Sequence, residues 1–204
     1  MRQLLLDFTQ APAPTFANFV PGGNGELLHA LQAAVQGHPA ERVLYMWGET
    51  ASGKTHLARA FELAVEGRRG VRVIDGVEAL SDEAQNELFN AFNAFNDRAF
   101  SFLLVSASCA PRDLAIRRDL ATRLATGLTY RVLPLTDGEK RAALAAHARA
   151  RGFELSEDVA SYLLTHARRD MGSLMSALDA IDRYSLENRR AVTVPLLKAA
   201  MTGT

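Results

Sequence analysis

One stretch of the sequence limits the fold more than any other. An apolar run rich in β-formers, Val43 to Trp47, leads directly into Gly-Glu-Thr-Ala-Ser-Gly-Lys-Thr at 48–55, and a helical pattern follows from His56 to Val65. This order of strand, glycine-rich loop and helix is the context that a phosphate-binding loop requires. The N–H groups of such a loop and of the helix start converge on an anion. A glycine-rich turn that only caps a helix is the alternative, and the flanking strand and helix favour phosphate binding.

Two side chains of this loop have predicted roles. Lys54 would bring positive charge to the β- and γ-phosphates of a nucleotide, and the Thr55 hydroxyl would hold Mg²⁺. We expect the remaining contacts to come from the rest of the loop and the first helical residue, namely Gly48, Thr50, Ala51, Ser52, Gly53 and His56.

Composition narrows the class of protein. The 204 residues allow one α/β domain and a small second domain, and 48% hydrophobic residues are enough for a substantial core. Equal numbers of basic and acidic residues, 23 each, argue against strong direct DNA binding, which needs a basic surface. The single cysteine, Cys109, excludes an internal disulfide and a cysteine-based zinc site. Leu4–Leu6 is too short for a signal peptide and no apolar run could span a membrane, so we expect a cytoplasmic protein without a membrane partner.

A second candidate for the nucleotide site follows the phosphate loop. Val71–Asp75 reads as a short strand that ends in a carboxylate, which suits the Mg²⁺ position of a P-loop nucleotidase; the alternative is an ordinary helix or turn cap. Gly76 stands where many ATPases have a second acid, which argues against fast hydrolysis by this chain. Glu78 is nearby, but helical or turn geometry would have to bring it to the site.

Polar and basic residues follow the next strand, predicted at Phe100–Val105. Ser106 and Ser108 at its end could sense a γ-phosphate or cap a loop, and both interpretations stay open. The segment 112–124 contains several arginines: either they form a solvated face, or one of them reaches a neighbour's nucleotide and stabilises the charge of phosphoryl transfer. The pattern alone does not choose among Arg112, Arg117, Arg118 and Arg123.

The C-terminal third reads as helical. A last strand is predicted at Tyr130–Leu135, a capping box follows at Thr136–Glu139, and we place a domain boundary at 135/136. Arg168 and Arg169 precede one of the helices, where a cation could fold over the nucleotide or remain a solvated surface residue. The helices are predicted at 137–150, 157–167 and 171–187, with a final segment after Pro195.

The N-terminal residues 1–15 read as an extended tail because Pro12 and Pro14 discourage helix and sheet. The apolar cluster within it, Gln-Leu-Leu-Leu-Asp-Phe at 3–8, has two interpretations. It packs on its own domain, or it is a short peptide that docks in the groove of another protein with alternate side chains as anchors.

The order of these parts resembles an AAA+ ATPase: a phosphate loop, a strand with Asp75, a strand ending in serines, an arginine-bearing segment and a helical lid with arginines. Shorter motifs resemble the DnaA-related regulatory inactivator family, the Hda family, across nearly the whole chain. They are Phe16-Ala-Asn-Phe-x-x-Gly-x-Asn24, Asp119-Leu-x-x-Arg-Leu-x-x-Gly127, Leu135-Thr-Asp, Arg151-Gly-Phe-Glu-Leu and Arg169-Asp-Met.

The resemblance implies roles for individual residues. Arg123 matches an arginine finger that acts in trans, and Arg169 matches the sensor arginine of the lid. Ser108 lies at the first-sensor position, where relatives often have an acid or an amide. The tail resembles a peptide that binds the sliding clamp, the β subunit of DNA polymerase III, and this resemblance favours docking on the clamp over packing on its own domain. Its anchors would be Gln3, Leu4, Leu6 and Phe8, and the residues bordering the nucleotide's base would be Phe19, Val20 and Asn24.

The resemblance also implies a fold and a function. We expect an α/β AAA+ base over 16–135, a helical lid over 136–204, and ADP or ATP with Mg²⁺ between them. Lys54 and Asp75 are only 21 positions apart, where relatives usually insert a strand and a helix, so the parallel sheet should be one edge strand short. The protein would dock on the DNA-loaded clamp, stimulate hydrolysis of DnaA-bound ATP and prevent re-initiation, with weak ATPase activity of its own; self-association is left open. The alternatives are a helicase-loader-like ATPase that turns over its own ATP and a non-catalytic adaptor.

Overall fold

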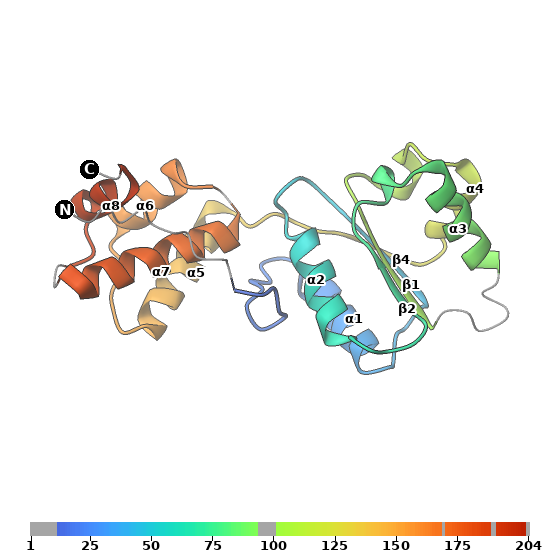
Figure 1. Cartoon of the computed structure of the whole chain (residues 1–204), viewed down its shortest axis with the longest axis horizontal. Coiled ribbons are helices and arrows are strands. Elements are labelled where there is room, and N and C mark those ends of the chain that lie inside the picture. Colours follow the sequence, from blue (N-terminus) through green and yellow to red (C-terminus); the bar gives the residue numbers. More distant parts are fainter. Residues whose placement is uncertain (1–11, 94–100, 169, 189–190, 203–204) are drawn as a thin grey trace. The chain divides into compact units, whose positions relative to one another are not determined.

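The computed structural model describes residues 12–93, 101–168, 170–188 and 191–202. The chain divides into two compact units between Pro134 and Leu135, and each is described here by itself. The first unit is α/β and the second is all-α (Figure 1). Within the described ranges, no helix combines the length and apolar character needed to cross a membrane.

The first unit is built on a four-stranded parallel sheet of order β2-β3-β1-β4. Tyr45 at the centre of β1 lies opposite Val105 of β3 and Thr129 of β4. This confirms the predicted α/β class with a short parallel sheet. Only α2 and a turn lie between β1 and β2, and β2 forms one edge of the sheet in the described part of the chain, as the short interval from Lys54 to Asp75 predicts. The strands are β1 (Val43–Trp47), β2 (Val71–Ile74), β3 (Phe102–Ala107) and β4 (Leu128–Arg131).

Helices cover both faces of this sheet, so its central strands are apolar on both sides (Figure 1). In β1, Leu44 and Met46 pack into the core under α1 and α2, whereas Val43 and Tyr45 pack into the core under α3 and α4. All four side chains are at most 7% exposed. The helices are α1 (Gly25–Val35), α2 (Lys54–Ala64), α3 (Asp82–Asn93) and α4 (Arg118–Leu124), with short 3₁₀ turns η1 (Val77–Ala79) and η3 (Pro111–Asp113).

Two strand predictions have wrong boundaries. β3 continues two residues beyond the predicted end, which places Ser106 inside the strand with 1% of its surface exposed. β4 ends at Arg131 and not at Leu135. The reason is a long-range contact: the buried Asn24 side chain accepts a hydrogen bond from the Leu133 N–H (2.7 Å) and donates one to the Leu133 carbonyl (2.9 Å). The backbone of Leu133 is therefore satisfied by a side chain instead of by a neighbouring strand.

Gly127, just before β4, is required by a close approach of two backbones. A Cβ atom at this position would lie 2.3 Å from the Val43 carbonyl oxygen and 2.6 Å from the Val43 Cβ, closer than real contacts allow. We expect Gly127→Ala to lower the free energy of unfolding by about 3 kcal/mol, because β1 must shift to relieve the overlap. Chemical denaturation measures this.

Gly138→Ala is the matched control for this variant. The nearest atom to a Cβ there is 4.0 Å away, and the position lies inside a helix, so stability should be unchanged or slightly higher. Equal stability of the two variants would contradict the packing argument.

In its described residues, the second unit packs four helices around one apolar core that includes Leu144, Leu163 and Leu178, each 0% exposed. Its first helix begins with the predicted capping box, in which Thr136 and Glu139 bond each other's backbone N–H groups. The helices are α5 (Asp137–Ala150), α6 (Glu157–His166), α7 (Met171–Asn188) and α8 (Val194–Thr202).

A polar cluster joins α5 to α7. Arg151 Nε donates to Asp182 Oδ2 (2.7 Å), and Arg151 Nη1 lies 3.2 Å from Asp179 Oδ1. The hydrogen bond to Asp182, followed by the charges of both carboxylates, raises the pKa of the Arg151 guanidinium. His147 Nε2 lies 2.6 Å from Asp179 Oδ1, so this histidine belongs to the same cluster.

Candidate nucleotide site and arginine-bearing face

The loop between β1 and α2 has the backbone of an anion-binding turn. Ala51 and Gly53 adopt positive φ angles of 62° and 107°. Gly48 lies against the chain after β4, because a Cβ there would be 2.5 Å from the Val132 carbonyl oxygen. Small residues are therefore needed at both glycine positions of the loop.

Lys54, the first residue of α2, folds back onto this loop. Its Nζ donates to the carbonyl oxygens of Gly48 (2.7 Å) and Glu49 (2.8 Å). Burial lowers the pKa of the Lys54 ammonium, while the charges of Glu78 and Asp75 oppose that change. The Ser52 hydroxyl is buried without a hydrogen-bond partner among the described residues. A partly buried ammonium and an unsatisfied hydroxyl in one loop fit a phosphate ligand.

Asp75 follows β2 and is held by a neighbouring strand. The Ser106 hydroxyl donates to Asp75 Oδ1 and accepts a hydrogen bond from the Gly76 N–H (2.9 Å). Ser106 thus positions the carboxylate predicted to face Mg²⁺. Ser108, the predicted sensor, is an exposed residue two positions further, and its backbone N–H donates to Glu78 Oε1 (2.8 Å).

The segment before α1 packs on the start of α2. The Phe19 ring lies 3.0 Å from the place that a Cβ of Gly53 would occupy, and its centroid is 5.5 Å from that of His56. His56 Nε2 donates to the Thr15 carbonyl oxygen (2.9 Å). Val20 is half-buried in the same segment. Phe19 and His56, predicted from separate motifs, are therefore neighbours beside the phosphate loop.

The two threonines of the loop are open to solvent, unlike the buried Ser52. Thr50 and Thr55 are both exposed residues. An exposed hydroxyl at the start of α2 is accessible to a metal ion or to phosphate oxygens.

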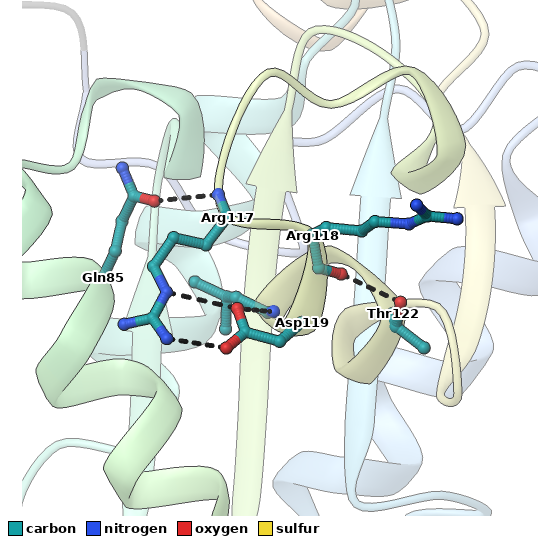
Figure 2. Close-up of polar contacts among 6 residues, drawn as sticks. Gln85, Arg117, Arg118, Asp119 and Thr122 are labelled. Carbon is teal, nitrogen blue, oxygen red and sulfur yellow. Dashed lines mark hydrogen bonds and ion pairs between the residues drawn. The ribbon is translucent and has the colours of Figure 1, made fainter.

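Away from this site, the arginine-bearing segment is fixed against α3 by Gln85. Gln85 Oε1 accepts a hydrogen bond from the Arg117 N–H (3.2 Å), at the residue before α4 (Figure 2). The Arg117 guanidinium is occupied by Asp119, through Nε to Oδ1 (3.2 Å) and Nη2 to Oδ2 (2.6 Å). The Arg118 side chain extends away from this pair (Figure 2).

Arg123 lies in the last turn of α4 and is an exposed residue. Its guanidinium carbon is 6.0 Å from the centroid of the Phe89 ring, and that of Arg117 is 5.0 Å from the same ring. Two cations thus share one aromatic side chain. No motif in the sequence marks Phe89 as a contact of these arginines, because the contact depends on how α3 and α4 pack together.

Several predicted site residues lie outside the described residues. They are Arg169 of the lid and the clamp-binding anchors Gln3, Leu4, Leu6 and Phe8. The neighbour of Arg169, Asp170, caps α7 by accepting a hydrogen bond from the Ser173 N–H (2.8 Å).

Comparisons with known proteins agree with this architecture. Residues 137–201 match the family model described as "Hda, lid domain". The fold is similar to domain III of the replication initiation protein DnaA of Thermotoga maritima, with a TM-score of 0.71 and 21% identity over 94% of this chain and 96% of that chain. It is also similar to AMPPCP-bound DnaA from Aquifex aeolicus, with a TM-score of 0.70 and 19% identity over 86% of this chain and 66% of that chain.

A third solved structure with a similar fold is not a DnaA protein. The Holliday junction branch migration motor RuvB of Thermotoga maritima matches with a TM-score of 0.63 and 16% identity, over 87% of this chain and 66% of that chain. The fold shared with these structures is that of an AAA+ protein. The chain therefore has the fold of DnaA's domain III, and residues 137–201 of its second unit match the lid domain of the Hda family.

Proposed function

We propose that this chain is a cytoplasmic regulator of replication initiation that binds ADP or ATP, docks on the DNA-loaded sliding clamp and stimulates hydrolysis of ATP bound to DnaA. The hydrolysis would inactivate DnaA and prevent re-initiation. The observation that carries the proposal is the Hda lid match over 137–201, in a chain whose fold is that of DnaA's domain III.

The proposed nucleotide site is the phosphate loop of the first unit. Its fit rests on the Lys54 ammonium, the unsatisfied Ser52 hydroxyl and the two glycines that leave room for an anion. Thr55 and Asp75 would hold Mg²⁺, which neutralises phosphate charge when bound. Arg169 of the lid would contact the same nucleotide, with Phe19, Val20 and Asn24 beside its base.

The proposed catalytic contribution to the partner is Arg123. A guanidinium that reaches the γ-phosphate of a neighbour's ATP stabilises the negative charge spread over the transferring group. Arg123 is exposed in the last turn of α4, which supports it as the residue that acts in trans. The nucleotide cleaved in this step belongs to DnaA, while the chain's own nucleotide keeps base and lid in a binding-competent arrangement.

The direct test is a reconstituted hydrolysis assay. ATP-loaded DnaA is mixed with the purified chain, nucleotide, and clamp loaded on DNA. We expect hydrolysis of the DnaA-bound ATP to accelerate only when chain, clamp and nucleotide are all present. Unchanged DnaA hydrolysis in the complete mixture would refute the proposed function.

Docking on the clamp is expected to depend on the tail. Replacing Gln3 and Leu4 with alanine removes two of the proposed anchors, and we expect clamp affinity to fall at least about 10-fold because each buried anchor contributes 1 kcal/mol or more. A clamp pull-down or a titration measures this. The same double replacement should leave nucleotide binding unchanged, and undiminished clamp binding would rule out the peptide.

The alternative function is a loader-like ATPase that turns over its own ATP. The observations that favour it are the hydrogen bond of Glu78 to the Ser108 N–H at the end of β3 and the effect of its charge on Lys54 of the phosphate loop. Fast hydrolysis by the purified chain alone, abolished in a Lys54→Ala variant, would support the loader. Slow hydrolysis that does not require a partner is compatible with the regulator.

A further inference from the structure

Glu78 lies at the nucleotide end of the sheet although it is three residues beyond Asp75. Gly76 adopts a left-handed conformation (φ 75°, ψ 62°), and the 3₁₀ turn η1 follows directly. Val77, 0% exposed, anchors this turn in the core under α3 and α4. The left-handed glycine and the tight turn together bring the next side chain, that of Glu78, back to the end of β3. A residue with a Cβ would be strained at Gly76.

The Glu78 carboxylate is held by a backbone hydrogen bond and is otherwise exposed to solvent. Its Oε1 accepts a hydrogen bond from the Ser108 N–H (2.8 Å), and the residue is exposed. Its charge acts on Lys54, where it opposes the effect of burial on the ammonium pKa, ahead of Asp75. It also adds to the effect of burial and of Cys109 in raising the pKa of Tyr45. Glu78 therefore belongs to the group formed by Lys54, Asp75 and the end of β3.

We propose that Glu78 is the general base for hydrolysis of the nucleotide that this chain itself holds. The proposal rests on nucleotide binding at the phosphate loop. Gly76 has no side chain that could activate water, and the turn that it begins supplies a carboxylate from a position two residues later. Gly76 stands where a second acid is expected, and its left-handed conformation allows Glu78 to take the place of that acid.

The chemical step balances with groups at this site. The Glu78 carboxylate accepts a proton from a water molecule while the water oxygen forms a bond to the γ-phosphorus of ATP. The bond between the γ-phosphorus and the β,γ-bridging oxygen breaks, and its electron pair stays on ADP. The products are ADP and inorganic phosphate, and Glu78 then returns its proton to solvent.

A structural role is the competing explanation, because Glu78 could do no more than hold the Ser108 N–H. Glu78→Gln separates the two roles: the amide oxygen can still accept that hydrogen bond, but it is a very weak base. Glu78→Ala removes both functions. Glu87→Gln on α3 is the matched control, since it removes an exposed carboxylate that has no place in the site.

The experiment measures single-turnover ATP hydrolysis with protein in excess, together with equilibrium binding of ATP and ADP. We expect Glu78→Gln to lower the hydrolysis rate about 10²-fold. We also expect it to raise the affinity for ATP relative to ADP about fivefold, because a negative charge facing the γ-phosphate is removed. Glu87→Gln should match the wild type in both measurements.

Three results overturn the proposal. Wild-type rate and wild-type ATP-to-ADP preference in Glu78→Gln, with loss of hydrolysis only in Glu78→Ala, would show a purely structural role. Bound ATP that the wild type never hydrolyses above the Lys54→Ala background would remove the step itself. Failure of the wild type to bind any nucleotide would overturn the proposed function as well, and binding measurements distinguish this from the other two results.

Discussion

Replacing Arg123 with alanine is expected to lower the clamp-dependent stimulation of DnaA ATP hydrolysis about 10³-fold. A guanidinium supplied in trans contributes 10³–10⁵ to the rate of phosphoryl transfer in roughly comparable systems, because it neutralises charge that develops only in the transition state. Arg123 is exposed at the end of α4, and its guanidinium lies over the ring of Phe89 on α3. Its loss should therefore not disturb the buried core. Single-turnover hydrolysis of labelled ATP on DnaA gives the rate directly.

Arg118→Ala serves as the matched control for Arg123. Arg118 is on the same helix and has the same charge, but its side chain extends away from the Arg117–Asp119 pair (Figure 2). We expect this variant to keep most of the stimulation. Equal loss of stimulation in both variants would indicate a general electrostatic contact with DnaA. Full stimulation in both variants would show that Arg123 is not the arginine finger.

Replacing Lys54 with alanine is expected to weaken binding of ADP and ATP about 10²-fold. The ammonium now donates to two loop carbonyls, and charge-assisted hydrogen bonds to phosphate would replace these contacts on binding. The loss should be specific for the phosphates, so the affinity for adenosine should not change. Isothermal titration with ATP, ADP and adenosine tests this selectivity.

A lysine variant outside the site controls for the general effect of removing a charge. Lys140→Ala lies in α5, and we expect its nucleotide affinity to equal that of the wild type. Thermal unfolding of both variants checks that the loop change has not unfolded the first unit. Equal weakening of adenosine and ATP binding in Lys54→Ala would mean that the lysine supports the loop instead of the phosphates.

Local patterns predicted much of the fold. The phosphate loop and α2 could be identified because glycine, lysine and helix-forming residues follow one another within a short stretch of chain. The capping box at Thr136 and Glu139 was equally local, since both partners lie on one helical turn. The short sheet followed from counting residues between Lys54 and Asp75. These features depend on neighbours in sequence, which a sequence displays directly.

The features that could not be predicted depend on residues far apart in the chain. β4 ends early because Asn24 bonds to the backbone of Leu133, 109 positions away. The position of Glu78 depends on a left-handed conformation at Gly76, which the sequence allows but does not require. The shared contact of Arg117 and Arg123 with Phe89 depends on how α3 packs against α4. Ser106 holds Asp75 because β3 continues past its predicted end.

The bond between Asn24 and Leu133 has a mechanical consequence. The first unit connects to the rest of the chain through the segment before α1 and the segment after β4, and one buried amide side chain joins these two segments. Val132, next to Leu133, packs against Gly48 at the start of the phosphate loop. A pull on the C-terminal connection is therefore transmitted through Leu133 to this amide side chain, beside the Val132 carbonyl that lies against Gly48.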